Sequence, residues 1–313
     1  MSSPLLSVII PARDAGATLA DTLEGLGAQE PAGAFEVILV DDGSRDRTAA
    51  IALESPIVGR VVTLDGVGPG QARNAGAALA RAPLLAFLDA DCRPTPRWLA
   101  AGSAALGAAD LVLGETRPRP DQPCGPFDRT LSVVGRSPLF EGANLFVRRE
   151  LFERIGGFES WLGPRRGKEL GEDVWFGWRA LRSGARIAAC DEALVHHVVW
   201  PRTASAFVAE RWRLRFFPAL VRRVPELRQE FLYRRLFLNY RAARFDAALL
   251  GLLLATATRR PALAAAAIPY ARTLSGDLRE PEGVQTALAQ VAADAVGLVA
   301  MLAGSVRYGT LLA

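Results

Sequence analysis

The feature that most limits the fold of this chain is a five-residue apolar run, residues 84–88, that ends at two carboxylates. The run is long enough for a buried strand and too short for its periodicity to indicate a helix. Because carboxylates are costly inside a core, Asp89 and Asp91 must lie just beyond the strand. In an open parallel sheet, ligands bind at that carboxyl end. The alternative is a helix N-cap followed by a turn, since an Asp-x-Asp pattern alone often arises by chance.

Two further apolar segments end in the same way. Residues 35–40 run into Asp41 and Asp42, and residues 7–10 run into Pro11 and Arg13. Each apolar segment is followed by a helix-like one, at residues 17–27, 48–54 and 70–81. This alternation predicts a parallel sheet with covering helices. Because crossovers between parallel strands are nearly always right-handed, the three polar strand ends should gather at one rim and could share one ligand.

The acids after the first run also indicate a metal site. Hard divalent cations such as Mg2+ prefer oxygen ligands and usually take one or two carboxylates together with substrate phosphates. Asp89 and Asp91 therefore suggest a cation that carries a phosphorylated substrate.

Composition narrows the class of protein. With 313 residues, half of them apolar, the chain can bury a sizeable core as one large domain or two smaller ones. Its three cysteines are odd in number and lack zinc spacing, which suits a reducing compartment and argues against a disulfide framework. The first residues lack a basic region followed by a long apolar one, so we expect no secretory signal.

The last third of the chain is basic. Residues 1–200 carry a net charge of −4, whereas residues 201–313 carry +8. Between Arg202 and Arg244, eleven arginines face three glutamates and are interleaved with aromatic residues. This pattern suits an interfacial helix on anionic lipid, and equally helices that pack on the rest of the protein and show arginine to solvent. A nucleic-acid surface is disfavoured, and we expect no nucleic-acid partner.

Two apolar segments lie further on, at residues 247–255 and 293–303. Neither reaches the roughly 18 to 20 residues that span a bilayer, so we expect buried core helices or re-entrant ones, and a spanning helix is the disfavoured alternative. The boundary between the two parts of the chain is predicted near Pro201.

Six motifs, taken in order, resemble those of family 2 glycosyltransferases. They are residues 7–11 (SVIIP), 40–44 (VDDGS), 72–76 (ARNAG), 88–91 (LDAD), 156–159 (GGFE) and 171–174 (GEDV). The resemblance covers about residues 5–200 and implies transfer of a sugar from a nucleotide sugar with inversion. It implies an α/β fold of the GT-A type, which is Rossmann-like, with a mostly parallel sheet and covering helices. We expect that domain over residues 1–200, with the nucleotide sugar on residues 1–115 and the acceptor on residues 116–200, followed by a helical region over residues 201–313.

The resemblance also implies a nucleoside pocket. Pro11, Arg13 and Asp42 occupy its positions, and a carboxylate there can accept the imide N–H of uracil, which favours a UDP-linked donor. The alternative is that Asp41 and Asp42 only cap a strand-to-helix turn.

Further positions are implied for the diphosphate. Asp91 is the better metal ligand, for Mg2+ or Mn2+, while Asp89 contacts ribose or metal-bound water or adds to the metal. His197 is the third candidate ligand, with a packed core histidine as the alternative. Arg73 could reach a phosphate or the ribose, or could face solvent.

For the acceptor, Asp173 is the candidate general base and Glu172 its support. Because Asp173 opens an amphipathic helix, a capping role is the alternative and is compatible with catalysis. The resemblance places residues 142–148 beneath the donor sugar and acceptor. Residues 161–168 form a basic loop that could close over the diphosphate, with a plain surface loop as the alternative.

These positions predict an inverting, metal-dependent transferase that acts on a lipid-linked or polysaccharide acceptor of the cell envelope. We expect it in the cytoplasm, peripheral at the inner face of the membrane, with an anionic membrane surface as a candidate partner. The alternatives are a non-catalytic relative that binds nucleotide sugar or lipid, and a nucleotidyltransferase. The last is weaker because its glycine-rich, lysine-bearing phosphate loop is absent.

Overall fold

The computed structural model describes residues 4–30, 34–162, 170–279 and 283–313. The chain divides into two compact units. Unit 1 comprises residues up to Cys124 and Thr130–Val199, and unit 2 comprises Gly125–Arg129 and Trp200–Ala313. The short segment Gly125–Arg129 therefore leaves the first unit and returns to it.

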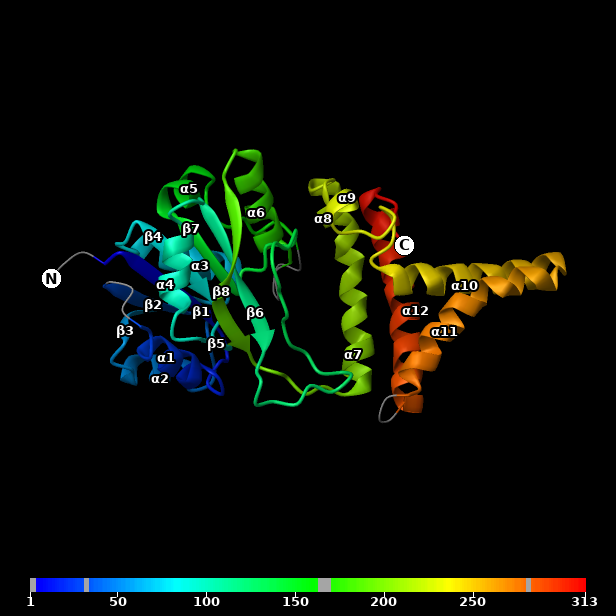
Figure 1. Ribbon diagram of the computed structural model, residues 1–313, viewed down its shortest axis with the longest axis horizontal. Coiled ribbons are helices and arrows are strands. Elements are labelled where there is room, and N and C mark those ends of the chain that lie inside the picture. The colour runs from blue at the N-terminus through cyan, green and yellow to red at the C-terminus, as the bar shows by residue number, and fades with distance from the viewer. Residues whose placement is uncertain (1–3, 31–33, 163–169, 280–282) are drawn as a thin grey trace. The chain divides into compact units, whose positions relative to one another are not determined.

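Unit 1 is built on an eight-stranded sheet, as far as the described residues show (Figure 1). Its strands are β1 (Leu6–Ala12), β2 (Phe35–Asp41), β3 (Val58–Thr63), β4 (Leu84–Leu88), β5 (Cys92–Pro94), β6 (Leu111–Pro118), β7 (Asn144–Arg148) and β8 (Ile187–His197). The order across the sheet is β3-β2-β1-β4-β7-β6-β8-β5. Strands β3, β2, β1 and β4 are parallel, β7 is antiparallel to both of its neighbours, and β8 is parallel to β6.

The helices of unit 1 cover this sheet. They are α1 (Leu19–Gly27), α2 (Thr48–Glu54), α3 (Pro69–Leu79), α4 (Trp98–Ala105), α5 (Arg149–Arg154) and α6 (Glu172–Arg182). Strand β1 is central, and its side chains alternate between two packed faces. Ile9 lies against Gly76 of α3, whereas Val8 and Ile10 join the cluster that contains Leu19 of α1. The predicted mixed, mostly parallel α/β fold with covering helices is thus confirmed.

The observed helices differ slightly from the predicted segments. Helix α3 begins at Pro69, whose fixed φ and missing N–H suit a first helical position, and Gly68 before it has a φ of +97°. It ends at Leu79 because Ala80 is extended. The chain then enters β4, in which all five residues are buried, as the apolar run 84–88 predicted.

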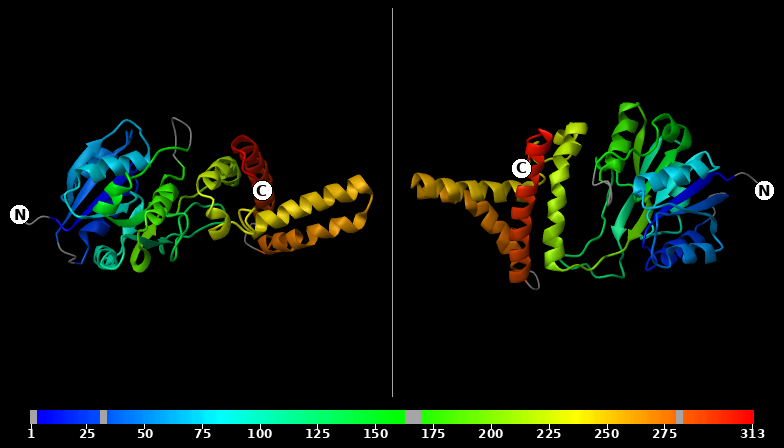
Figure 2. Two further views of the ribbon diagram at one scale, coloured as in Figure 1. Left: turned by 90° about the horizontal axis from the view of Figure 1, so that it is seen from above. Right: turned by 180° about the vertical axis from the view of Figure 1, so that it is seen from behind.

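Unit 2 is helical. Its elements are α7 (Ala204–Glu210), the 3-10 helix η1 (Arg211–Phe216), α8 (Phe217–Arg223), α9 (Leu227–Glu230), α10 (Tyr240–Thr258), the 3-10 helix η2 (Pro261–Ala267), α11 (Ile268–Asp277) and α12 (Gly283–Tyr308). Helices α7, η1 and α8 follow one another along α12 (Figure 2). Helix α10 folds back through η2 and α11 to form a hairpin. The predicted helical C-terminal region is confirmed.

Helix α12 corrects one expectation about length. Its 26 residues make it, by length and composition, the one described helix that could cross a membrane, although 39% of its most apolar window is buried inside unit 2. The segment is longer than residues 293–303 suggested because small, uncharged residues extend it toward Gly283. Within unit 2, its Asp294 accepts hydrogen bonds from Arg241 Nε at 2.8 Å and from the hydroxyl of Tyr270 at 2.7 Å.

Candidate active site

The ends of the parallel strands meet at one rim of the sheet. Ala12 of β1 pairs with Asp41 of β2, and the backbone N–H of Asp42 donates to Ala12 O at 2.8 Å. The N–H of Leu64, just after β3, donates to Asp41 O at 2.8 Å. Three chain segments far apart in sequence are therefore locked together where the sheet ends.

Asp42 organises the loop that leads into α3. One carboxylate oxygen accepts the N–H of Val67 at 2.7 Å, and the other accepts the N–H of Gly68 at 2.9 Å. Asp42 is buried, so these bonds replace the water that a carboxylate would otherwise require. Each oxygen retains a second lone pair, so a role in recognising a base is compatible with this geometry and stays a prediction.

The other predicted nucleoside residues lie nearby. Pro11 is part of β1 beside Val40, and Arg13 follows the strand with an exposed side chain. A Cβ added to Gly66 would lie 3.1 Å from Arg13 Nη1, so the guanidinium covers the loop after β3.

Arg73 of α3 connects the Asp-x-Asp segment to the start of α6. Its Nη2 donates to Asp89 Oδ1 at 2.7 Å, and its Nη1 lies 3.6 Å from Glu172 Oε1. Arg73 is only 4% exposed, so the alternative of a solvent-facing arginine is wrong. Its Nε and Nη1 atoms donate no hydrogen bond to any residue that the structure describes, which leaves two buried donors for a ligand.

Asp173 lies in the first turn of α6, directly after Gly171, whose φ is +71°. Its Oδ2 accepts the N–H of Gly142 at 3.3 Å, and its Oδ1 accepts the N–H of Val174 at 2.8 Å. Burial, followed by the negative charge of Glu172, raises the pKa of Asp173 to about 7. Such a carboxylate is poised to accept a proton near neutral pH.

Asp91 and His197 approach each other from β5 and β8. His197 pairs with Cys92 across the two strands, and its Nε2 lies 3.5 Å from Asp91 Oδ2. Its Nδ1 lies 2.6 Å from Val198 O, a carbonyl that can only accept, so Nδ1 is the donor in this contact. His196 lies on the opposite face of β8, with Nδ1 3.4 Å from Pro118 O.

These residues fit a divalent cation. The side-chain ligand atoms of Asp91, Cys92 and His197 lie within 4.8 Å of one another. Burial, together with the charges of Asp91 and Asp89, raises the pKa of the Cys92 thiol well above its ordinary value, so it remains protonated and suits the metal poorly. Asp91 supplies a hard oxygen, and His197 supplies Nε2, while the carbonyl of Val198 fixes its Nδ1. Asp89 is engaged by Arg73 instead.

Asn144 is a site residue that the sequence did not single out by itself. Its side chain donates to Glu115 O and Ala193 O, both at 2.8 Å, and accepts the indole N–H of Trp98 at 2.8 Å. This buried amide ties β7 to β6 and β8 immediately after residues 142–143. Its place at the start of the apolar segment 144–147 was the one available signal.

The predicted basic loop, residues 161–168, lies mostly outside the described residues. The GGFE motif before it is held by Asn74, whose side chain exchanges two hydrogen bonds with the backbone of Phe158 at 2.7 and 2.8 Å. The motif thus fixes the chain that leads to the loop.

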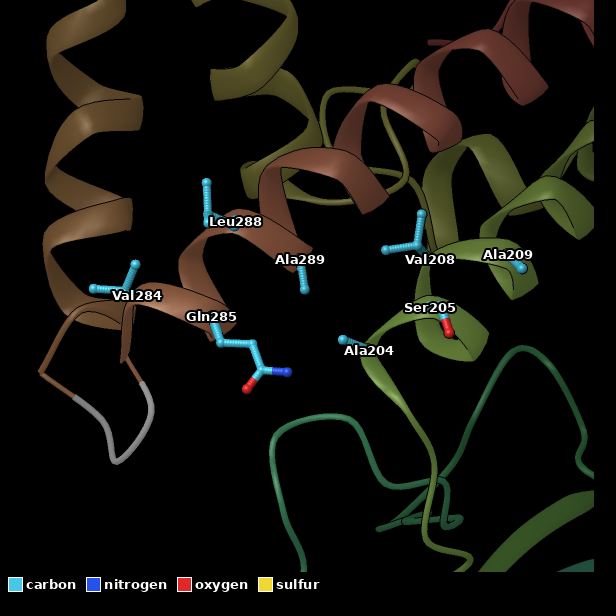
Figure 3. Close-up of a pocket in the computed structure, with 8 residues that line it drawn as sticks. All are labelled: Ala204, Ser205, Val208, Ala209, Val284, Gln285, Leu288 and Ala289. Atoms are coloured by element: carbon cyan, nitrogen blue, oxygen red, sulfur yellow. The ribbon is translucent and has the colours of Figure 1, made fainter.

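Unit 2 contains a separate apolar groove of about 750 Å3 between α7 and α12. Figure 3 shows its lining, which includes Val208, Val284 and Leu288. Its polar side chains, Ser205 and Gln285, carry no charge, so the groove lacks the groups that proton transfer or metal binding requires.

Sequence comparison agrees with this geometry. Residues 7–156 match the family described as Glycosyl transferase family 2. The chain is 29% identical over 213 residues to Glycosyltransferase AglE of Haloferax volcanii, a match that covers 63% of this chain and 68% of the relative. It spans about a quarter of the length of other curated relatives, 26 to 28%.

The fold also has solved counterparts. Mannosyltransferase PcManGT from Pyrobaculum calidifontis, solved with GDP-Man and Mn2+, is 20% identical with a TM-score of 0.65, over 98% of this chain and 88% of the other. S. aureus TarS 1-349, solved with UDP-GlcNAc, is 17% identical with a TM-score of 0.51, over 97% of this chain and 92% of the other. At such identities the likeness establishes the fold.

Proposed function

This chain belongs to glycosyl transferase family 2, whose members use nucleotide sugars, and on that premise we propose that it is an inverting transferase with Asp173 as general base. The donor is a nucleotide diphosphate sugar, UDP-linked in our proposal. The acceptor is a hydroxyl of a lipid-linked or polysaccharide molecule.

The observation that carries this proposal is the setting of Asp173. Inversion in one displacement requires the acceptor hydroxyl to attack opposite the leaving phosphate, while a fixed base takes its proton. The N–H groups of Gly142 and Val174 hold the carboxylate, and its pKa of about 7 lets it act near neutral pH. Glu172 supports it by raising that pKa.

Arg73 supplies positive charge between the donor and the base. One of its nitrogens is held by Asp89, while Nε and Nη1 are buried without a hydrogen-bond acceptor among the described residues. In the proposed complex, these two N–H groups donate hydrogen bonds to an oxygen on the phosphate or ribose of the nucleotide sugar. Asp89 orients Arg73 and contacts the ribose or metal-bound water.

A divalent cation, Mg2+ or Mn2+, would be held by Asp91 and His197. When bound, it would neutralise the charge of the diphosphate that leaves. His197 Nε2 lies 3.5 Å from Asp91 Oδ2, and the Cys92 thiol, 4.0 Å from Asp91 Oδ1, donates to the same carboxylate.

The proposed location is the inner face of the cell membrane, where the enzyme would build cell-envelope glycans. The net charge of +8 over residues 201–313 supports an anionic surface as partner. Lipid-linked acceptors are held at such a surface, so a peripheral enzyme would meet them without leaving it.

The test is nucleotide release from a panel of UDP- and GDP-linked sugars, with Mn2+ and with chelator. We expect slow hydrolysis of one UDP-sugar that requires the cation, and an Asp91→Ala variant that lacks the metal-dependent part. Hydrolysis of GDP-sugars alone would overturn the UDP assignment. If the protein binds a nucleotide sugar but turns it over with none of the added acceptor extracts, the non-catalytic alternative would be favoured.

A further inference from the structure

Helices α10, η2 and α11 form a hairpin (Figures 1 and 2), and most of its large apolar side chains are exposed. Seven of them are 38 to 58% exposed: Leu249, Leu250, Leu252, Leu253, Leu254, Leu263 and Ile268. In a hairpin surrounded by water, such residues would fill the contact between the helices. The apolar segment 247–255 is therefore not the buried core helix that was one of the two expectations.

Small residues fill the contact between the two arms instead. Ala248 and Gly251 are the buried residues of α10. A Cβ on Gly251 would lie 2.6 Å from Ala266 Cβ and 2.7 Å from Leu263 O, so the arms approach more closely than any larger residue would allow. Close contact through small residues, with leucines outside, is typical of helices that pack in lipid.

The hydroxyl groups of the hairpin are satisfied by its own backbone. Thr256 Oγ1 donates to Leu253 O at 2.8 Å, and Thr258 Oγ1 donates to Leu254 O at 2.6 Å. On the other arm, Thr273 Oγ1 donates to Pro269 O at 3.1 Å. These polar groups consequently need no water, which suits an apolar environment.

Charged residues bound the apolar stretch of each arm. No charged residue lies between Asp246 and Arg259, or between Arg260 and Arg272. Arg259 and Arg260 at the tip, and Arg272 at the base, form no ion pair with any residue that the structure describes. Both ends of the hairpin thus carry arginines that complement anionic headgroups.

Arginines nearer the start of unit 2 form ion pairs within that unit. Arg202 pairs with Glu210, and Arg241 bonds to both Asp277 and Asp294. The segment from Arg202 to Arg244 is therefore tied into unit 2 at both ends, and the exposed apolar surface lies beyond it.

The length of the apolar stretch decides its orientation. Residues 247–258 rise about 18 Å as a helix, much less than the roughly 30 Å of hydrocarbon in a bilayer. A hairpin that stood along the membrane normal would place the tip arginines in hydrocarbon, whereas one lying in the interface keeps both ends among headgroups.

We propose that the hairpin of α10, η2 and α11 lies in the interface of an anionic bilayer, with its leucines among the acyl chains and its arginines among the headgroups. This proposal deepens the membrane location proposed above by assigning it to one element. A second copy packed in parallel is disfavoured as the occupant, because it would bring together Arg259 and Arg260 at the tips of the two hairpins.

Flotation with vesicles of phosphatidylcholine, with and without phosphatidylglycerol, tests the proposal on the full chain. We expect binding to the anionic vesicles that weakens with salt but leaves a salt-resistant fraction. Leu250→Glu with Leu253→Glu should lower partitioning at least tenfold and remove that fraction. Arg259→Gln with Arg260→Gln should lower binding to anionic vesicles about 30-fold at low salt, because each arginine adds about a factor of five to six there.

The matched control is Leu53→Glu, which changes a still more exposed leucine (72%) on α2 of unit 1 and should float like the unchanged protein. All changed leucines are exposed, so each variant should keep its thermal unfolding midpoint. Flotation of the Leu250/Leu253 variant at the unchanged level would overturn the proposal. The proposal would also be overturned if the unchanged protein does not float but forms a dimer that the Leu250/Leu253 variant disrupts.

The catalytic proposal is scored separately by nucleotide release without vesicles. A protein that floats as expected but releases no nucleotide would overturn the catalytic assignment and leave the hairpin proposal standing. A protein that releases nucleotide but never floats would overturn the hairpin proposal and leave the catalytic assignment standing.

Discussion

Arg73 Nη2 donates a 2.7 Å hydrogen bond to Asp89 Oδ1, and this pair joins helix α3 to the end of strand β4. A Cβ on Gly142 would lie 3.0 Å from the guanidinium carbon, so the arginine fills the space beneath that loop. The two acids of the Asp-x-Asp segment thus have different neighbours: Asp89 faces Arg73, and Asp91 faces His197. We therefore expect the first acid to position Arg73 and the second to bind the metal.

The first prediction concerns the base. Asp173→Asn should lower the transfer rate by roughly 100- to 10,000-fold, because only proton removal is lost. Nucleotide affinity, measured by calorimetry, should stay unchanged. Glu150→Gln, an exposed change on α5, is the control. Unchanged transfer by the Asp173 variant to an accepted substrate would exclude it as base.

The second prediction follows from the raised pKa of Asp173. Transfer should rise with pH and reach half its maximum near pH 7, because only the ionised carboxylate accepts a proton. Glu172→Gln should move this midpoint to lower pH, since it removes the neighbouring negative charge. An unchanged pH midpoint in Glu172→Gln would contradict the coupling between Glu172 and Asp173.

The same pKa fixes the sign of a stability effect. The folded pKa, about 7, exceeds the ordinary value of 3.8, so the folded protein binds this proton more tightly than the unfolded chain. The contribution is fully present below about pH 4 and is lost as pH rises through 7. Urea unfolding at several pH values should therefore show a shallower decline over this window in Asp173→Asn.

The third prediction concerns the metal. Asp91→Ala should weaken the binding of Mn2+ and of UDP, while uridine binding hardly changes, because the carboxylate reaches the phosphates through the cation. His197→Ala should act in the same direction. His196→Ala, on the other face of β8, is the matched control. Equal losses for UDP and uridine would mean that Asp91 shapes the pocket directly.

The fourth prediction concerns Asp42. Asp42→Asn keeps one acceptor for the N–H groups of Val67 and Gly68 and sets its own N–H₂ against the other. An unsatisfied buried group costs about 1–3 kcal/mol, so the unfolding free energy should fall by that order and uridine should bind more weakly. Asp65→Asn, exposed in the adjacent loop, should change neither. Full uridine affinity in the Asp42 variant would remove Asp42 from the nucleoside pocket.

Much of unit 1 could be predicted because its signals are local. The run 84–88 predicted a buried strand because it is apolar throughout and too short for a helix. Asn144 could not be found this way, because its partners Trp98, Glu115 and Ala193 come from three distant elements. The proximity of Asp91 and His197 likewise depends on the pairing of β5 with β8, which no local pattern encodes.

Unit 2 was less predictable for a related reason. Hydropathy reports that residues 247–255 are apolar, but not which of their faces are covered. The outcome depends on Gly251, whose missing side chain lets η2 occupy the contact and leaves the leucines outside. Which face of α10 is covered is therefore seen only once the positions of η2 and α11 are known.

The last prediction concerns the charge network of unit 2. Asp294 accepts from Arg241 and from Tyr270, and all three side chains are largely buried. Asp294→Asn should therefore lower the unfolding free energy by on the order of 3 kcal/mol, because it leaves a buried cation with only Asp277. Adding Arg241→Met should restore part of the loss, since it removes the uncompensated charge. Val306→Thr, 87% exposed on the same helix, serves as the reference and should unfold like the unchanged protein. If Asp294→Asn unfolds no earlier than this reference, the network contributes nothing measurable, and packing alone holds α10 to α12.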